Sequence, residues 1–324
     1  MRALVSLAMM LALLPVSFAC AQSAQGTIYA VDYDRLYSVN PTTFEANLLG
    51  KAGNNGPQAI GDLSGLTTAP GGTLYAASDT LKALVRIDPS NGHATVVGDF
   101  GITTAQTGLA LNEPLDFGMT YGCNGKLWLS SATAGKLWQV NPSNGASTLV
   151  GTFGPTISGL TMRGGKLLGA GARGDEGLYA IDTSSGEASA IGGYGAAIDY
   201  AASVSPGIDA HGDLLAAINY VPPPAGVNVR DWSDMAAINP DTGVATILGT
   251  ITSPDDLRQI GIRGLTFGPP DCDPRSTNGK PPPVGPPLSN PHAVPSSGLL
   301  AALLQWLALA AAAGLALRRR FARL

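Results

Sequence analysis

The chain has 324 residues, of which only 13% are charged and 6% aromatic, while 42 are glycine, a composition typical of an exported all-β protein. Acidic residues outnumber basic ones by 23 to 19. Five of the basic residues lie in the two terminal segments, so the central region is more acidic still, and we expect no nucleic-acid partner.

The N-terminal segment has the three parts of a secretory signal. Residues 1–21 contain one arginine, an apolar run and a small-residue exit at Ala19, Cys20 and Ala21. This pattern predicts export, with cleavage after Ala21. A lipoprotein attached through Cys20 is the alternative, although Ser17 stands where such signals usually carry leucine.

A fifteen-residue pattern recurs five times and predicts a β-hairpin. Its clearest copy, residues 137–151, reads LWQVNPSNGASTLVG, with two β-prone halves around an Asn-Pro-Ser-Asn-Gly turn. Four copies keep the turn glycine, and Phe44 replaces it in the first. A loop of four or five residues around a type I turn is expected. The other copies are residues 36–50, 84–98, 178–192 and 235–249.

A second pattern precedes most copies. It consists of a short strand of small residues, a glycine-rich turn and an apolar strand. Together the two hairpins give four antiparallel strands, which is one propeller blade, and small residues suit the crowded inner strand beside the axis. The pattern covers residues 64–78, 117–131 and 158–172, with a looser version at 199–219.

The two ends of the repeat region complete each other. The first hairpin is preceded by one strand only, at residues 26–32, and the missing inner strand appears at residues 263–270. We therefore predict an all-β, five-bladed β-propeller over residues 22–270, closed by N- and C-terminal strands in one blade, which removes a free edge. A six-bladed ring is the alternative, if a strand at residues 108–111 belongs to a hidden blade.

Two cysteines remain after the signal peptide, Cys123 and Cys272. Export implies an oxidising compartment, which makes them candidates for a disulfide. Each follows an inner strand of its blade, so both should emerge near the axis on the same face. Two free thiols are the alternative, because the two blades are not neighbours.

The repeats stop where the C-terminal segments begin. Residues 271–297 are rich in Pro, Gly, Ser and Asn and read as an extended spacer. Residues 298–317 are apolar and long enough for one transmembrane helix. The arginine cluster in residues 318–324 places this tail in the cytoplasm.

The end of the chain also resembles a known class of signal. AVPSSG, one apolar helix and a terminal arginine cluster are similar to the C-terminal sorting signals of Gram-negative exported proteins, the PEP-CTERM and IPTL-CTERM types. Residues 294–297 read Val-Pro-Ser-Ser where those signatures carry Val-Pro-Glu-Pro or Ile-Pro-Thr-Leu. The resemblance implies processing or anchoring at the cell envelope by sorting machinery, often in species that make extracellular polysaccharide. A plain membrane anchor is the alternative.

The connections of a propeller alternate between two faces. One face should carry only tight turns, and we call it the tight-turn face. The opposite face, the loop face, should carry the long segments, which are the default binding surface of a rigid scaffold. The spacer leaves from the tight-turn face, so the loop face should point away from the membrane. The long segments are residues 51–62, 99–116, 219–232 and 250–263.

Aspartates on the loop face are the first candidate site residues. A ring of carboxylates around the axis is a candidate Ca²⁺ site, the one cofactor that we consider. Asp116 and Asp199 are also candidates for the acid and the nucleophile or base of glycoside hydrolysis. Alternatively, these residues only cap turns and strand starts. The four aspartates are Asp62, Asp116, Asp199 and Asp256.

Tyr220 and Trp232 are the second candidates, as an aromatic patch for a sugar or a partner, or alternatively as part of a loop packed on itself. Residues 169–174 match GxGxxG, but a strand follows instead of a helix, so no dinucleotide site is expected.

We therefore expect an envelope-displayed, non-enzymatic module that binds a ligand or partner, such as an extracellular polysaccharide or a surface protein of the matrix. A carbohydrate-active hydrolase or lyase and a purely structural matrix component are the alternatives.

Overall fold

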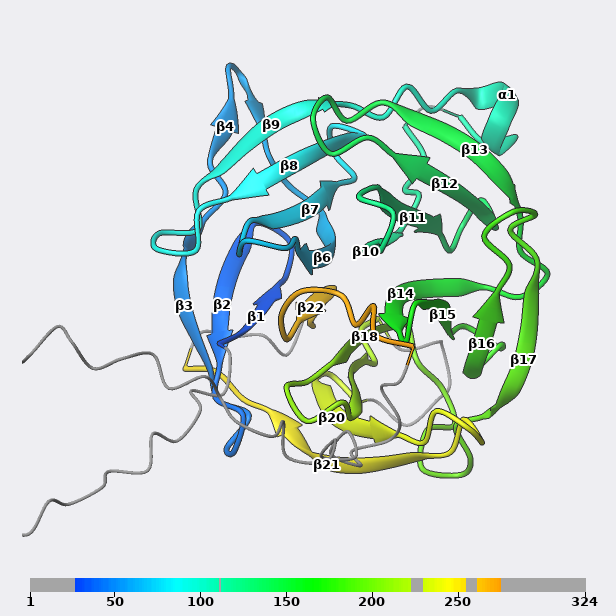
Figure 1. Cartoon of the computed structure of the whole chain (residues 1–324). Helices are drawn as coiled ribbons and strands as arrows, with labels where there is room; N and C mark the ends of the chain where they lie inside the picture. The colour runs from blue at the N-terminus through cyan, green and yellow to red at the C-terminus, as the bar shows by residue number, and fades with distance from the viewer. Residues whose placement is uncertain (1–26, 111, 223–229, 255–260, 275–324) are drawn as a thin grey trace, which may run out of the picture. The chain divides into compact units, whose positions relative to one another are not determined.

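The computed structural model describes residues 27–110, 112–222, 230–254 and 261–274, and five four-stranded antiparallel sheets surround one axis (Figure 1). The five-bladed β-propeller is confirmed. In the described chain no strand lies between β9 and β10, which removes the six-bladed alternative. From the axis outward, blade 1 is β22 (Gly264–Thr266), β1 (Ile28–Val31), β2 (Arg35–Val39) and β3 (Ala46–Lys51).

The other four blades follow in chain order. Blade 2 is β6 (Leu63–Thr68), β7 (Leu74–Ser78), β8 (Ala83–Ile87) and β9 (Ala94–Asp99), and blade 3 is β10 (Phe117–Tyr121), β11 (Leu127–Ser131), β12 (Lys136–Val140) and β13 (Ser147–Thr152). Blade 4 is β14 (Ile157–Arg163), β15 (Lys166–Gly171), β16 (Gly177–Ile181) and β17 (Ala188–Gly193), and blade 5 is β18 (Ser203–Ile208), β19 (Leu214–Asn219), β20 (Ser233–Ile238) and β21 (Ala245–Ile251).

Two small elements lie in the connections on the loop face. A two-stranded hairpin, β4 (Asn54–Asn55) and β5 (Gln58–Ala59), follows blade 1, and the short helix α1 (Thr104–Thr107) follows blade 2. No helix of the described ranges is long and apolar enough to cross a membrane. The predicted signal peptide, the apolar helix at residues 298–317, the basic tail and most of the spacer lie outside the described residues.

Blade 1 is built from both ends of the repeat region. β22 pairs antiparallel with β1, in the register Tyr29↔Thr266, Ala30↔Leu265 and Val31↔Gly264. The pairing gives β1 a neighbour on both sides and closes the ring.

Glycines allow neighbouring blades to touch through their backbones near the axis. A Cβ atom on Gly118 of β10 would lie 2.5 Å from the carbonyl oxygen of Ser158 in blade 4, and one on Gly159 would lie 2.1 Å from that of Val204 in blade 5. Any side chain there would force two inner strands apart. This contact explains the glycine at these two positions of the inner strands.

The last glycine of the fifteen-residue repeat has a similar role at the rim. A Cβ atom on Gly151 of β13 would lie 1.6 Å from the carbonyl oxygen of Ser185, in the hairpin turn of the next blade. At the seam between blades 5 and 1 the neighbour of Gly249 is instead the ring of Phe44. The one repeat copy without a turn glycine is therefore the copy at the ring closure.

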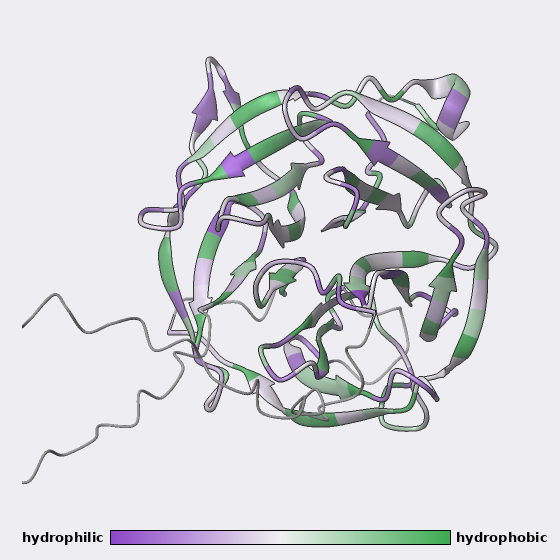
Figure 2. Ribbon diagram, viewed as in Figure 1, coloured by the Kyte–Doolittle hydropathy of each residue, from purple (hydrophilic) through white to green (hydrophobic). Residues whose placement is uncertain are grey.

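Burial changes from the axis to the rim. Every residue of β6 is buried, whereas β13 contains only half-buried and exposed residues. In Figure 2 the outer strands carry both hydrophobic and hydrophilic residues. The core consists of the apolar side chains between successive blades, with Trp138 and Tyr37 among the largest fully buried ones.

The segment after β22 closes the tight-turn end of the axis. The backbone amides of Gly164 and Gly165 donate to Asp271, with an N–O distance of 2.8 Å to its carboxylate and 3.1 Å to its carbonyl. Cys272 forms a disulfide with Cys123, at a Cα–Cα distance of 5.6 Å. Between this segment and the inner strands remains a cavity of about 20 Å³, so the axial channel has no room for a ligand at this end.

Candidate binding sites on the loop face

The starts of the inner strands meet around a cavity of about 40 Å³ at the loop-face end of the axis. We call this cavity the axial mouth. Each blade supplies one residue or more near the strand start, and Arg173 and Asn219 complete the polar lining. The five strand-start residues, from blade 1 to blade 5, are Arg263, Ser64, Asp116, Ser158 and Ser203.

Ion pairs connect four blades across the mouth. The Nη1 atom of Arg263 lies 2.6 Å from Oδ1 of Asp62, and its Nη2 atom lies 3.0 Å from Oδ1 of Asp116. Arg173 donates from Nη1 to Oδ2 of Asp116 at 2.9 Å and from Nε to the carbonyl of Ala202 at 2.9 Å. Both oxygens of Asp116 therefore accept a hydrogen bond from an arginine.

The arginines decide the protonation state of Asp116. Burial alone would raise the pKa of its carboxyl, but the charges and hydrogen bonds of Arg173 and Arg263 together hold the pKa below its ordinary value. Asp116 is consequently an ionised acceptor at neutral pH and not a proton donor.

Two further observations mark the mouth as unusual. Five described non-glycine residues have a positive φ, and three of them belong to this network: Asp62 at 47°, Asp116 at 49° and Arg173 at 56°. Such backbone is costly and tends to cluster at functional sites. In addition, Ser64 is 5% exposed, and its hydroxyl has no hydrogen-bond partner among the described residues.

The predicted ring of four carboxylates is only partly assembled. Asp62 and Asp116 directly precede β6 and β10 and share Arg263, whereas the Asp199 side chain is 69% exposed and lies 3.7 Å from Arg230. Asp256 lies outside the described residues. Within the described chain no three His, Cys, Asp or Glu residues form a metal-binding group. A pair of carboxylates already bonded to arginines does not offer the six to eight oxygen ligands of Ca²⁺.

Tyr220 belongs to the core, since it is only 2% exposed. Its ring meets the Trp232 ring edge-to-face at a centroid distance of 6.5 Å, and the Arg230 guanidinium lies 4.7 Å from its centroid. Burial is also the main cause that raises the pKa of Tyr220 to about 12. Of the two predicted aromatic residues, Tyr220 therefore supports the site and Trp232 lines it.

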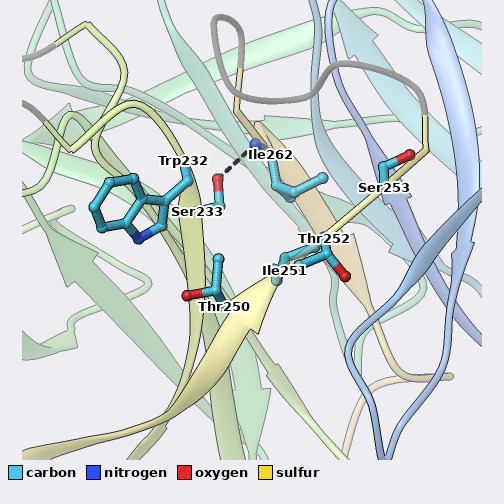
Figure 3. A pocket seen from close by; sticks show the side chains of 7 residues that line it. All are labelled: Trp232, Ser233, Thr250, Ile251, Thr252, Ser253 and Ile262. Atoms are coloured by element: carbon cyan, nitrogen blue, oxygen red, sulfur yellow. Dashed lines mark hydrogen bonds between the residues drawn. The ribbon is translucent and has the colours of Figure 1, made fainter.

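Trp232 lines a cavity of about 350 Å³, which we call the Trp232 cavity (Figure 3). It lies between the first residue of β20, the last residues of β21 and the segment that leads into β22. The lining combines three apolar residues with four hydroxyl-bearing ones, and none of these described residues is charged. They are Trp232, Ile251, Ile262, Ser233, Thr250, Thr252 and Ser253.

Sequence reasoning missed both arginines of the mouth. Arg263 stands immediately before the Gly-Leu-Thr of its inner strand, where the copies in blades 2 and 4 have Ser64 and Ser158. The sequence did contain a signal for Arg263, because it is a charged residue at a repeat position that faces the axis. Arg173 gave no comparable signal, because its partners come from other blades.

Fold and sites together define a five-bladed β-propeller with two neighbouring cavities on its loop face. No family model matches the chain, and no curated protein matches it. Among solved structures, the chain is similar to virginiamycin B lyase from Staphylococcus aureus, with a TM-score of 0.42 and 13% identity over 70% of this chain and 67% of that one. It is also similar to Kuenenia stuttgartiensis hydrazine synthase, with a TM-score of 0.39 and 16% identity over 58% of this chain. The match spans 50% of that protein's length, and neither likeness bears on activity.

Proposed function

We propose that this protein is a non-catalytic binding module that holds a neutral saccharide in the Trp232 cavity on its loop face. The observation that carries the proposal is the lining itself, which combines one tryptophan with four hydroxyl-bearing residues and lacks charge among its described members. An indole ring packs against the apolar face of a sugar, and the hydroxyls exchange hydrogen bonds with it. Binding needs no cofactor on this proposal.

The size of the cavity agrees with a small ligand. Ligand pockets usually measure roughly 300–1,000 Å³, and the Trp232 cavity has about 350 Å³. Such a volume suits a short piece of a saccharide better than the broad contact surface of a folded protein. A surface protein of the matrix, the other partner class that the loop face suggested, is therefore the less favoured ligand.

The axial carboxylates support binding better than hydrolysis. A glycosidase needs one carboxyl group that is protonated near neutral pH. Asp116 accepts hydrogen bonds from two arginines and has a lowered pKa, and Asp199 lies apart from the mouth. No observation in the described chain favours the hydrolase or lyase reading.

We place this module at the cell envelope. The proposal rests on the signal-like residues 1–21 and on the resemblance of the C-terminal residues to a sorting signal. The segment after β22 leaves on the tight-turn face, bound to Cys123 and Gly165 there. An anchor that follows it would leave the loop face, with the Trp232 cavity, free for an extracellular saccharide.

The test is a glycan array with the full-length protein purified in a mild detergent, followed by calorimetry on the ligands found. Trp232→Ala should weaken binding at least about tenfold, or about 1.4 kcal/mol, because it removes the stacking surface. Tyr33→Ala is the matched control: Tyr33 is an exposed aromatic residue in a connection of the same face and does not line the cavity. Absence of any saccharide ligand, or equal effects of both variants, would overturn the proposal.

A further inference from the structure

The Trp232 cavity lies at one of the five seams between neighbouring blades, and the repeat shows what fills the other four. In every blade the residue two positions after the last glycine of the fifteen-residue repeat ends the outer strand or directly follows it. This residue is buried at all five seams, and we call it the seam residue. The seam residues, from blade 1 to blade 5, are Ala52, Phe100, Phe153, Tyr194 and Ile251.

An aromatic ring fills three of the seams. Phe100 meets Phe117 of blade 3 edge-to-face, at a centroid distance of 5.3 Å. Phe153 lies in the core cluster between blades 3 and 4, and Tyr194 lies in the cluster between blades 4 and 5. None of the three seam residues is more than 4% exposed. A ring at this repeat position therefore closes the space between two blades.

The two remaining seam residues have no ring. Between blades 1 and 2 the small side chain of Ala52 is accompanied by Ile60, which follows β5 and is buried in the same cluster. At the closing seam, between blades 5 and 1, the seam residue is Ile251. Here a cavity of about 350 Å³ lies beside it.

The backbone contact at the closing seam is also different. The carbonyl oxygens of Ala52, Phe100 and Tyr194 each accept a hydrogen bond from the first residue of the next outer strand. At the closing seam the amide of Ala46 donates instead to Thr252, one residue beyond the seam residue, at 2.7 Å. Blades 5 and 1 therefore meet one residue later than the other blades do.

The cavity is polar at its rim and apolar at its base (Figure 3). Trp232 is half-buried and the hydroxyl-bearing Thr250 and Thr252 are exposed, whereas Ile251 and Ile262 are buried. A ligand that enters from the rim meets the indole and the hydroxyls first. An apolar group gains free energy by leaving water for the space beyond, and a hydroxyl group gains less because it loses hydrogen bonds to water.

We propose that Ile251 determines the specificity of this site, and that the ligand is a neutral saccharide with a methyl-bearing substituent, as in an N-acetylated or a deoxy sugar. Because position 251 carries no ring, the methyl group takes the place that a seam residue fills in blades 2, 3 and 4, while the sugar ring lies against Trp232. This inference rests on the proposed function, because it presupposes a saccharide in the Trp232 cavity.

The first test compares ligands that differ in the methyl-bearing group. The full-length protein is titrated with β-linked tetrasaccharides of N-acetylglucosamine and of glucose, and with the free sugars L-rhamnose and L-mannose. Within at least one pair the methyl-bearing member should bind at least about fourfold more tightly, which is the gain expected from one buried methyl group. The pair that shows the preference tells whether the substituent is an acetyl group or the methyl group of a deoxy sugar.

The second test supplies the missing ring. Ile251→Phe should weaken binding of the preferred ligand at least about tenfold, because the phenyl ring occupies the place of the substituent. Its Tm should not fall, since the added volume enters a cavity and the equivalent position carries a ring in three other blades. Leu248→Phe is the matched control, because Leu248 is 46% exposed on the same strand and does not line the cavity. It should bind as the wild type does.

The outcomes separate this inference from the proposed function. A Tm of Ile251→Phe well below that of the wild type would mean that the closing seam has no room for a ring, and the inference would fall. It would also fall alone if Trp232→Ala abolished saccharide binding while the members of each pair bound alike, or while Ile251→Phe bound as the wild type does. If no saccharide binds, or if Trp232→Ala has no effect, the proposed function and this inference fall together.

Discussion

Arg263 and Asp62 form an ion pair across 201 positions of the sequence, with 2.6 Å between Nη1 and Oδ1. Arg263 immediately precedes β22, the strand that closes the ring, and Asp62 precedes β6 of blade 2. A second bond of the same guanidinium reaches Asp116 in blade 3. The closing strand is therefore held at the loop face by these ion pairs and at the tight-turn face by the disulfide of Cys272.

Arg263→Met should destabilise the propeller. The substitution removes both ion pairs and leaves two partly buried carboxylates near each other without their shared cation. Because Arg263 is 26% exposed, between the surface and the buried cases, we expect the free energy of unfolding to fall by about 1–3 kcal/mol. Urea unfolding at neutral pH measures this change in the free energy of unfolding.

Lys51→Met is the matched control. Its ion pair with Asp34 spans 3.6 Å, and the Lys51 side chain is 67% exposed. A solvated pair of this kind contributes little, so the loss should stay below about 0.5 kcal/mol. If Lys51→Met lost as much unfolding free energy as Arg263→Met, the place of Arg263 at the ring closure would give its ion pairs no extra stabilising effect.

The fold could be predicted because its signals are local and repeated. Every blade carries its own turn chemistry, and the missing inner strand of the first repeat indicated how the ring closes. The role of Phe44 could not be predicted, because it depends on Gly249, a residue of another blade that contacts it only once the ring has closed. The network of Arg263 depends in the same way on which strand starts face each other across the axis.

Asp116→Asn should change how stability depends on pH. The two arginines depress the pKa of Asp116 in the folded state. The resulting stabilisation is complete above the unfolded pKa of about 3.9 and is lost as the pH falls through the lower folded pKa. Asp116→Asn should therefore be less stable than the wild type at pH 7, and the difference should shrink below about pH 4.

Urea midpoints between pH 7 and pH 2.5 provide the measurement, with Asp34→Asn as the control, since the lysine of its ion pair is 67% exposed. Parallel curves for wild type and Asp116→Asn would show that the arginines do not stabilise the ionised carboxylate.

The candidate site was predictable only in part. Trp232 was predicted as a site residue because an aromatic residue in a long connection indicates a binding surface, but sequence spacing does not tell which of two nearby aromatic rings turns inward. Tyr220 lies directly after β19 and packs into the core, whereas Trp232 lies directly before β20 and lines the cavity. Asp199 is separated from β18 by a further connecting segment, so it misses the axis that Asp62 and Asp116 reach.

Cys272→Ser should weaken the closure of the ring. The disulfide joins residues 149 positions apart, and the chain-entropy model gives up to about 5 kcal/mol for a loop of this length. We expect a loss of about 2–5 kcal/mol in the free energy of unfolding, measured under oxidising conditions. A reducing agent should lower the stability of the wild type to that of the variant and leave Cys272→Ser unchanged. A wild type that is indifferent to reduction would contradict this prediction.

Gly151→Ala tests whether the repeat glycine is required by contact between blades. A Cβ atom at this position would lie 1.6 Å from the carbonyl oxygen of Ser185, which is backbone and cannot rotate away. We expect a loss of about 2–4 kcal/mol, because the two blades must separate locally.

Gly154→Ala is the control, since no atom of the structure lies within 4 Å of the added Cβ. Gly249→Ala should fall between them, because its neighbour at 3.0 Å is the side chain of Phe44, which can shift. Thermal unfolding of the three variants gives the order of their stabilities. If Gly151→Ala were as stable as Gly154→Ala, the blades would adapt to the added methyl group, and contact between blades would not be the reason for the glycine.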